Sequence, residues 1–318
     1  MAHINFISDL KEVITQKLSR LGHPPVPEED IDTLLIRSLN LARRVPPIIK
    51  WTVMPSNELA RKSLLPEIRL GLEQFIKKAE SGQNLKPHLS KKSDEPDYKD
   101  LMFYDWEVFH FHLGTNSNPN HNEFVKRTGA LLFAIADSNT ARMYLIDIHP
   151  HRGGFTNQNL LRIVKDNWAE ILAPHTLNRV IELDSNWSDN DIDSLRKAGI
   201  NPILQIPDGP VLLSMGGGIT TAGTSRLNIM DADIIKTDVR QLQELFTQPT
   251  YGVAAYFKSR YAKNWEELTF KVRSFETRME IMEIEEMTTG EFVQFTEFSI
   301  PLAKLLTELE ELREQEDS

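Results

Sequence analysis

Residues 129–149 read GALLFAIADSNTARMYLIDIH and contain two strand-like runs joined by a short polar turn. Aromatic and β-branched residues are frequent in both runs, which is typical of β-strands. The first run is apolar at successive positions and therefore predicts a central strand that is buried on both faces. The preceding segment FYDWEVFHFHL, at 103–113, has the same character and predicts another strand. Together these runs predict a sheet in the middle of the chain.

Helical patterns precede this sheet. Apolar residues recur at three- and four-residue steps over 4–21 and 28–44, which predicts two helices. Ser56 is suited to cap a third helix, which Pro66 kinks or restarts. The stretch 83–99 is polar and contains two prolines, so it predicts a linker or mobile loop.

The pattern after the sheet is more varied. We expect a helix over 157–172, strands over 179–183 and 227–235, and a hairpin within 268–298. A final acidic helix over 299–316 carries leucines along one side, which predicts that this side docks on the core or on a partner.

The whole pattern predicts an α+β (or mixed α/β) fold. Its parts are a helical N-terminal region, a central and mainly antiparallel sheet, and a C-terminal β-hairpin and helix. The predicted segments are a helical region at 1–92, a central α/β sheet domain at 97–235 and an acidic helix and hairpin region at 236–318.

The composition narrows the class of protein. The 318 residues are 40 % hydrophobic and 26 % charged, which is an ordinary globular balance. There is no cysteine, which excludes disulfides, thiolate zinc sites and thiol nucleophiles. No apolar run approaches the roughly 20 residues that span a bilayer. We therefore expect a soluble cytoplasmic protein with no membrane partner.

The net charge of −10 comes from one end of the chain. Residues 265–318 hold 15 acidic and 5 basic side chains, whereas residues 1–264 hold 31 of each. The acidic end is either an ordinary solvated surface or a surface for a basic protein partner or a second copy of the chain.

Motifs for cofactors are missing. The glycines of Met215–Ile219 are not followed by the lysine of a phosphate-cradling loop, and no G-x-S-x-G elbow occurs in the sequence. The sequence therefore predicts no cofactor.

Four of the nine histidines form two close pairs, His110 with His112 and His149 with His151. Side chains two positions apart on a strand point to the same face. Neutral imidazole accepts a proton near pH 7 and imidazolium donates one. Histidines on adjacent strands can thus act as base and acid across a phosphodiester, while Arg127 binds the phosphate by a bidentate fork. The attacking group would be the ribose 2′-hydroxyl, which DNA lacks.

Two other interpretations of the histidines stay open. His110, His112, His149 and His151 are candidate ligands for zinc or another transition ion, although no H-E-x-x-H pattern is present. Alternatively, the histidines only satisfy local hydrogen bonds.

The strands FYDWEVFHFHLG, RTGALLFAIAD and ARMYLIDIHPH, followed by a helix, resemble the core of the RelE/ParE-type toxins over residues 97–172. The resemblance implies an endoribonuclease in which His110, His112, Arg127 and His149 stand at catalytic or RNA-contacting places. The segment departs from that pattern because it holds 7 basic and 9 acidic side chains. It also has no run of lysines after its last strand.

The leading hypothesis is a toxin-like or defence-related endoribonuclease that needs no metal. His110, His112, Arg127 and His149 would be its catalytic residues and RNA its substrate. The alternatives are a non-enzymatic interaction protein, whose acidic C-terminal region docks a partner, and a histidine-coordinated metal hydrolase.

Overall fold

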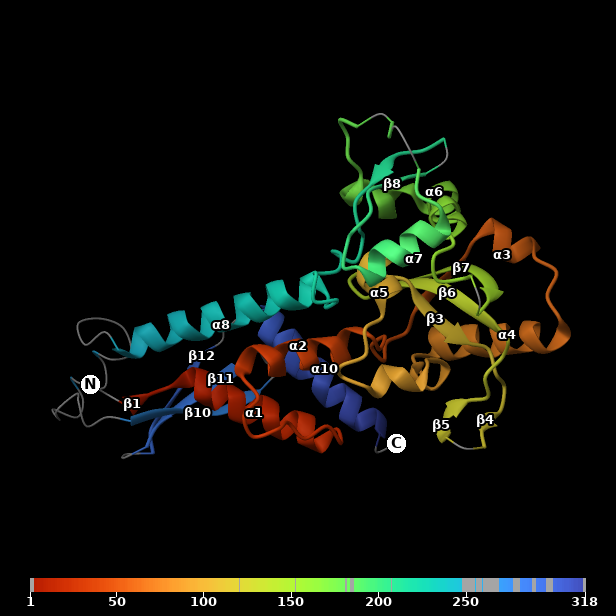
Figure 1. The fold of residues 1–318 in the computed structure, drawn as a ribbon. Helices are drawn as coiled ribbons and strands as arrows, with labels where there is room; N and C mark the ends of the chain where they lie inside the picture. Colours follow the sequence, from red (N-terminus) through yellow and green to blue (C-terminus); the bar gives the residue numbers. More distant parts are fainter. Residues whose placement is uncertain are drawn as a thin grey trace. The chain divides into compact units, whose positions relative to one another are not determined.

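The computed structural model of this chain describes residues 3–119, 121–151, 153–180, 182–183, 186–206, 208–247, 255, 259, 269–276, 281–287, 290–295 and 300–316. The chain forms two compact units. One consists of Met1–Ala42 with Asn228–Ser318, and the other of Arg43–Leu227. Helices and largely antiparallel sheets occur in both (Figure 1), so the predicted α+β class is confirmed.

The first unit, which we call the terminal unit, joins the two ends of the chain. Its sheet has the order β1-β10-β11-β12, in which only β1 and β10 are parallel. Its elements are β1 (His3–Ile4), α1 (Phe6–Arg20), α2 (Ile31–Arg43), α8 (Arg226–Thr247), β10 (Thr269–Glu276), β11 (Ile281–Glu286), β12 (Phe292–Phe295) and α10 (Ile300–Glu316).

The leucine side of α10 is buried in the terminal unit, as one interpretation of its pattern predicted. The ion pair between Lys17 and Glu310 (2.6 Å) links α1 to α10. The leucines therefore stabilise this unit and leave only the polar side of α10 for a partner. The buried leucines of α10 are Leu302, Leu305, Leu306, Leu309 and Leu312.

The second unit, which we call the central unit, holds the predicted hairpin and the histidines. Its helices and strands are β2 (Thr52–Pro55), α3 (Asn57–Arg61), α4 (Pro66–Ser81), α5 (Leu101–Trp106), β3 (Phe109–His112), β4 (Ser117–Asn118), β5 (His121–Val125), β6 (Ala130–Asp137), β7 (Arg142–Pro150), α6 (Asn159–Leu172), α7 (Asp189–Lys197), β8 (Leu204–Gln205) and β9 (Val211–Leu212). Short 3₁₀ helices are η1 (Lys86–His88), η2 (Lys91–Asp94) and η3 (Ala173–His175).

The main sheet of the central unit has the order β2-β7-β6-β3. The β6–β7 hairpin is the one that the sequence predicted, and only β2 pairs in parallel. Figure 1 shows α4 along one face of this sheet and α6 and α7 over the other. Leu131 and Phe133 of β6 pack in the core under α6, whereas Phe111 of β3 contacts Phe75 of α4 (ring centroids 4.8 Å apart).

The boundaries of the two compact units differ from those of the three segments that the sequence predicted, 1–92, 97–235 and 236–318. Residues 43–92 belong with the central sheet because β2 pairs with β7 and α4 packs on the sheet. The C-terminal region belongs with the N-terminal helices because β10 pairs with β1. Contacts between segments that are distant in sequence therefore decide where each unit ends.

One predicted strand, 227–235, is helical, and the predicted strand 103–113 is helical in its first part and a strand in its second. Residues 101–106 form α5, and Glu107 after it has a left-handed backbone (φ 57°), so β3 begins only at Phe109. Residues 227–235 belong to α8, because the buried side chains Asn228, Ala232 and Ile235 follow the helical period.

Two further local predictions are wrong. The described residues of 179–183 contain no strand. The stretch 83–99 is a packed segment and not a loose linker, because Leu85, His88 and Leu89 are buried. None of the described helices is long and apolar enough to cross a membrane.

Gly71 of α4 lies against the carbonyl group of Leu113, at the end of β3. A Cβ at this position would overlap that backbone carbonyl. Gly71→Ala is therefore expected to destabilise the central unit by about 1–3 kcal/mol, although glycine-to-alanine changes inside helices usually stabilise by about 0.5–1 kcal/mol. Urea unfolding measures the change. The control is Leu70→Ala at the neighbouring exposed position, and a Gly71→Ala variant more stable than the wild type contradicts the close packing.

Candidate functional site

The register of the main sheet fixes where the histidines lie. His112 of β3 pairs with Leu131 of β6, and Leu131 pairs with His149 of β7. His110 pairs in the same way with Phe133. Residues directly opposite each other on paired strands share a face. His110 and His112 therefore lie on the α6 side of the sheet, on its edge strand, and His149 lies two strands away.

Phe155, in the loop before α6, joins two of these histidines. The ring of His110 meets the Phe155 ring edge to face, with centroids 4.9 Å apart. His151, just after β7, meets the same ring at 5.1 Å. Phe133 packs on Phe155 from β6 at 6.1 Å. Imidazoles from β3 and from the end of β7 thus gather around the ring of Phe155, a residue that the sequence did not indicate.

His112 and Arg127 complete this group. His112 is only 5 % exposed, and burial lowers the pKa of its imidazole to about 4. Burial is the largest cause of this shift, and the charges of Arg127, His110, His151 and His88 contribute the rest of it. The pKa of His151 is lowered as well, first by burial and then by the charges of His110 and Arg127. We call His110, His112 and His151 the imidazole cluster.

A pocket of about 190 Å³ opens beside His112, and we call it the basic pocket. Lys91 and Arg127 bring positive charge to it from η2 and from the segment after β5. None of the described residues that line it is acidic. The lining consists of Leu89, Lys91, His112, Asn118, Phe124, Val125 and Arg127.

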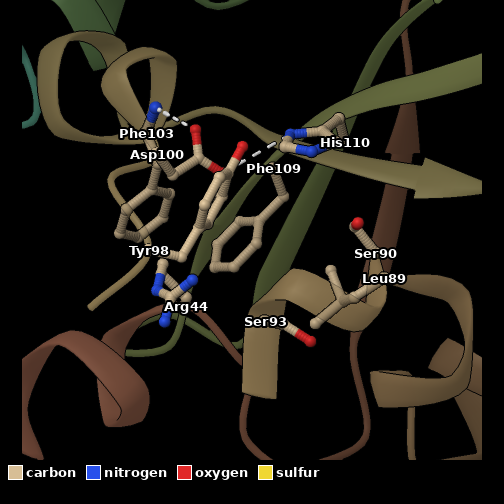
Figure 2. Close-up of a pocket in the computed structure, with 9 residues that line it drawn as sticks. All are labelled: Arg44, Leu89, Ser90, Ser93, Tyr98, Asp100, Phe103, Phe109 and His110. Atoms are coloured by element: carbon tan, nitrogen blue, oxygen red, sulfur yellow. Dashed lines mark hydrogen bonds and ion pairs between the residues drawn. The ribbon is translucent and has the colours of Figure 1, made fainter. Parts of the chain in front are cut away.

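A second, much smaller pocket lies beside His110 (Figure 2). Asp100 caps the start of α5 by accepting a hydrogen bond from the backbone N–H of Phe103 (3.1 Å). Its other carboxylate oxygen is 3.8 Å from Nδ1 of His110, so the two groups form an ion pair when His110 is protonated. The volume of about 20 Å³ suits one water molecule and no larger ligand.

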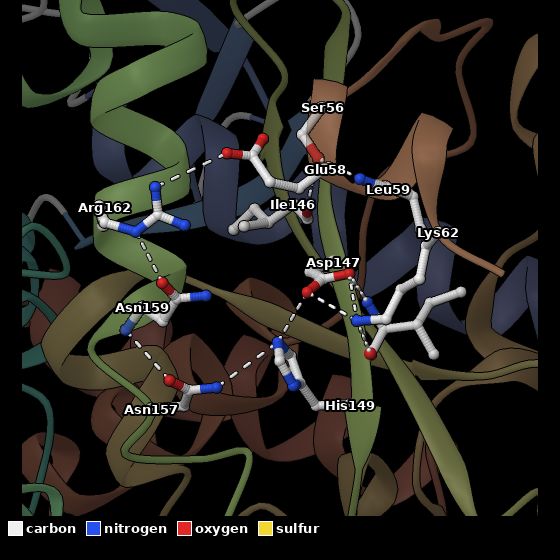
Figure 3. A network of polar contacts seen from close by, with 11 residues as sticks. Ser56, Glu58, Leu59, Lys62, Ile146, Asp147, His149, Asn157, Asn159 and Arg162 are labelled. Carbon is white, nitrogen blue, oxygen red and sulfur yellow. Dashed lines mark hydrogen bonds and ion pairs between the residues drawn. The ribbon is translucent and has the colours of Figure 1, made fainter. Parts of the chain in front are cut away.

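His149 belongs to a different network (Figure 3). Its Nε2 is 2.9 Å from the Asp147 carboxylate, which also accepts hydrogen bonds from Lys62 at 2.7 and 2.8 Å. Burial would raise the pKa of Asp147, but hydrogen bonds from His149, Lys62 and the Ile148 N–H lower it below its usual value. Asn157 lies 3.5 Å from the same nitrogen of His149. The His149 ring also meets the ring of Phe133 (centroids 6.2 Å apart), which packs on Phe155, so aromatic rings separate His149 from the imidazole cluster.

The predicted residues are thus divided between two places. His110, His112, Arg127 and His151 lie together, whereas His149 is held by Asp147 and Lys62. Within the described part of the chain, no group of three or more His, Asp or Glu side chains is arranged to hold a metal ion. The four candidate metal ligands therefore do not form a metal site there.

Sequence reasoning missed Phe155, Lys91 and Lys62. The spacing of Asp147 and His149 on one strand face is a local signal that indicates their pairing. Lys62 and Lys91 lie far from their partners along the chain and have no such signal.

Comparisons of this chain with protein-family models, with curated proteins and with solved structures give no match.

Proposed function

We propose that this chain is an endoribonuclease that needs no metal and uses the imidazole cluster for acid–base chemistry. The observation that carries the proposal is the meeting of His110 and His151, from separate strands, on the ring of Phe155. Arg127 adds a guanidinium next to this group, which suits the phosphate of an RNA backbone.

The proposed reaction uses His112 or His151 as the base and His110 as the acid. His112 and His151, which are neutral at pH 7 because their pKa values are lowered, can take the proton of a ribose 2′-hydroxyl. The 2′-oxygen then attacks phosphorus, the bond from phosphorus to the 5′-oxygen breaks, and a 2′,3′-cyclic phosphate forms. His110, which pairs with Asp100 when it is protonated, can give its proton to the leaving 5′-oxygen. His149 remains a second acid–base candidate, positioned by Asp147.

A cleavage assay with labelled single-stranded RNA tests the proposal. We expect cleavage in the presence of a chelator and none of DNA of the same sequence, which lacks the 2′-hydroxyl. The double variant His110→Gln with His151→Gln is expected to lose at least about 100-fold in rate, since each general acid or base contributes that much or more. His175→Gln is the matched control, because His175 lies in η3 and outside the imidazole cluster.

Two results would overturn the proposal. One is the absence of cleavage of any RNA by the wild-type protein. The other is equal cleavage by the double variant and by the control, with circular dichroism showing that both are folded.

A further inference from the structure

The basic pocket carries positive charge that the described protein does not neutralise. Lys91 and Arg127 are exposed, and no carboxylate of the described residues pairs with either of them. The positive charge of Lys86, on the neighbouring turn, is neutralised, because Lys86 pairs with Asp94 at 3.0 Å. Two cations that line one pocket without a counter-charge attract an anion.

His112 adds a second and independent observation. Its side chain lines the same pocket, is 5 % exposed and has a buried Nδ1 without a hydrogen-bond partner among the described residues. Leaving a buried polar atom unpaired is unfavourable, and such atoms in folded proteins call for an explanation. Because the nitrogen itself is buried, an oxygen of a ligand in the pocket would pair with it once the His112 ring turns towards the pocket.

The size of the pocket limits the ligand. Its volume of about 190 Å³ is smaller than the roughly 300–1,000 Å³ of pockets for drug-sized molecules. Arg127 can form a bidentate pair with two oxygens, whereas Lys91 acts as a point charge. Leu89, Phe124 and Val125 provide an apolar wall beside these charges.

We propose that the basic pocket binds the phosphate group of a nucleotide, held by Lys91, Arg127 and His112. This binding goes beyond strand cleavage, because the pocket can hold a phosphate whether or not the chain cuts RNA. Lys91 is the residue that this proposal adds, and in the proposed nuclease it would help to hold the substrate backbone.

Isothermal titration with inorganic phosphate and with uridine 3′-monophosphate, at constant ionic strength, tests the proposal. We expect Lys91→Met to weaken the binding of both by about tenfold or more, as the loss of a charge-assisted hydrogen bond does. Lys92→Met is the matched control. Lys92 lies on the same 3₁₀ turn but against the ring of Tyr98 (4.8 Å to the centroid), and its removal is expected to change affinity less than twofold. Tighter binding of the nucleotide than of phosphate distinguishes a nucleotide site from a site for the free ion.

An NMR titration of the histidines gives a second readout. Bound phosphate should raise the pKa of His112, since a nearby anion favours the protonated imidazole. The groups around His112 are Arg127, His110, His151 and His88, all of which oppose its protonation without the ligand. The pKa of His175 should stay unchanged.

The outcomes separate this proposal from the nuclease. If neither probe binds the wild-type protein, or if Lys91→Met and Lys92→Met bind equally well, the phosphate site is refuted even when RNA is cleaved. If the probes bind as expected and RNA stays intact, the phosphate site stands and the nuclease is refuted.

Discussion

Lowering the pH from 7 to 4 is expected to destabilise the central unit by on the order of 3 kcal/mol for each of two buried histidines, His88 and His112. Burial is the main cause that lowers the pKa of each from its usual 6.5 to about 4. Between pH 6.5 and about pH 4, these two histidines bind more protons in the unfolded chain than in the folded one. Stability is therefore fully present above about pH 6.5 and falls as the pH decreases towards 4.

The contacts of His88 explain why its neutral form is built into the fold. Nδ1 of His88 lies 2.8 Å from the carbonyl oxygen of His112, which can only accept, so Nδ1 carries the hydrogen. Nε2 then accepts a hydrogen bond from Lys78 at 3.1 Å. Protonation of Nε2 would replace this hydrogen bond by a repulsion between a buried imidazolium and the half-buried Lys78 ammonium. The ring of Phe75 makes a T-shaped contact with the same imidazole (centroids 5.2 Å apart).

Tryptophan fluorescence during urea unfolding, at several pH values in buffers without phosphate, measures this loss. Four of the five tryptophans, Trp51, Trp106, Trp168 and Trp187, lie in the central unit, so the signal reports mainly on it. The variant His112→Gln does not titrate and should lose about half as much stability between pH 7 and 4. A free energy of unfolding that stays constant over this range would show that neither histidine is buried in its neutral form.

Replacing Arg196 with Met is expected to lower the free energy of unfolding of the central unit by about 3–5 kcal/mol. Arg196 and Asp105 are 2 % and 1 % exposed, with Nε of the arginine 2.9 Å from the carboxylate. Ser214 donates a hydrogen bond to the other carboxylate oxygen, and the guanidinium lies 4.1 Å over the Trp106 ring. Removal of the arginine leaves a buried carboxylate without its counter-charge. An uncompensated buried charge strongly destabilises the folded state.

The same substitution should disturb the imidazole cluster. Nη1 of Arg196 donates a hydrogen bond to the carbonyl oxygen of Phe155 (2.6 Å), and the Phe155 ring contacts both His110 and His151. We therefore expect NMR signals of these two histidines to shift in Arg196→Met.

Urea unfolding with two comparison variants checks the Arg196 prediction. Arg162→Met removes a half-exposed arginine that pairs with Asp166 on the same helix and with Glu58 of α3, and it should cost at most about 1 kcal/mol. Asp105→Asn combined with Arg196→Met removes both charges and should recover part of the lost stability. Equal losses in Arg196→Met and Arg162→Met would mean that the Asp105 pair contributes no more than a surface pair.

Local patterns in the sequence determined a large part of the fold. The helices α1, α2 and α10 follow from the periods of their apolar residues, because those periods depend only on backbone geometry. The β6–β7 hairpin follows from two runs of aromatic and β-branched residues around a short polar turn. The same reasoning was wrong for residues 103–106 and 227–235. In the first, the aromatic residues that suggest a strand are held in a helix, and Asp105 pairs with an arginine 91 positions away. Long-range packing overrode the local preference there.

The sequence by itself also determined which residues were candidates for chemistry, since the paired histidines and Arg127 are visible in it. Only the tertiary structure decided which of them meet. It placed His110 and His151 on one phenylalanine ring, joined Lys62 to Asp147, and brought Lys91 to the pocket of His112 and Arg127. The physical reason is that strand register, loop packing and buried ion pairs join segments far apart along the chain, and residue spacing holds no record of those contacts.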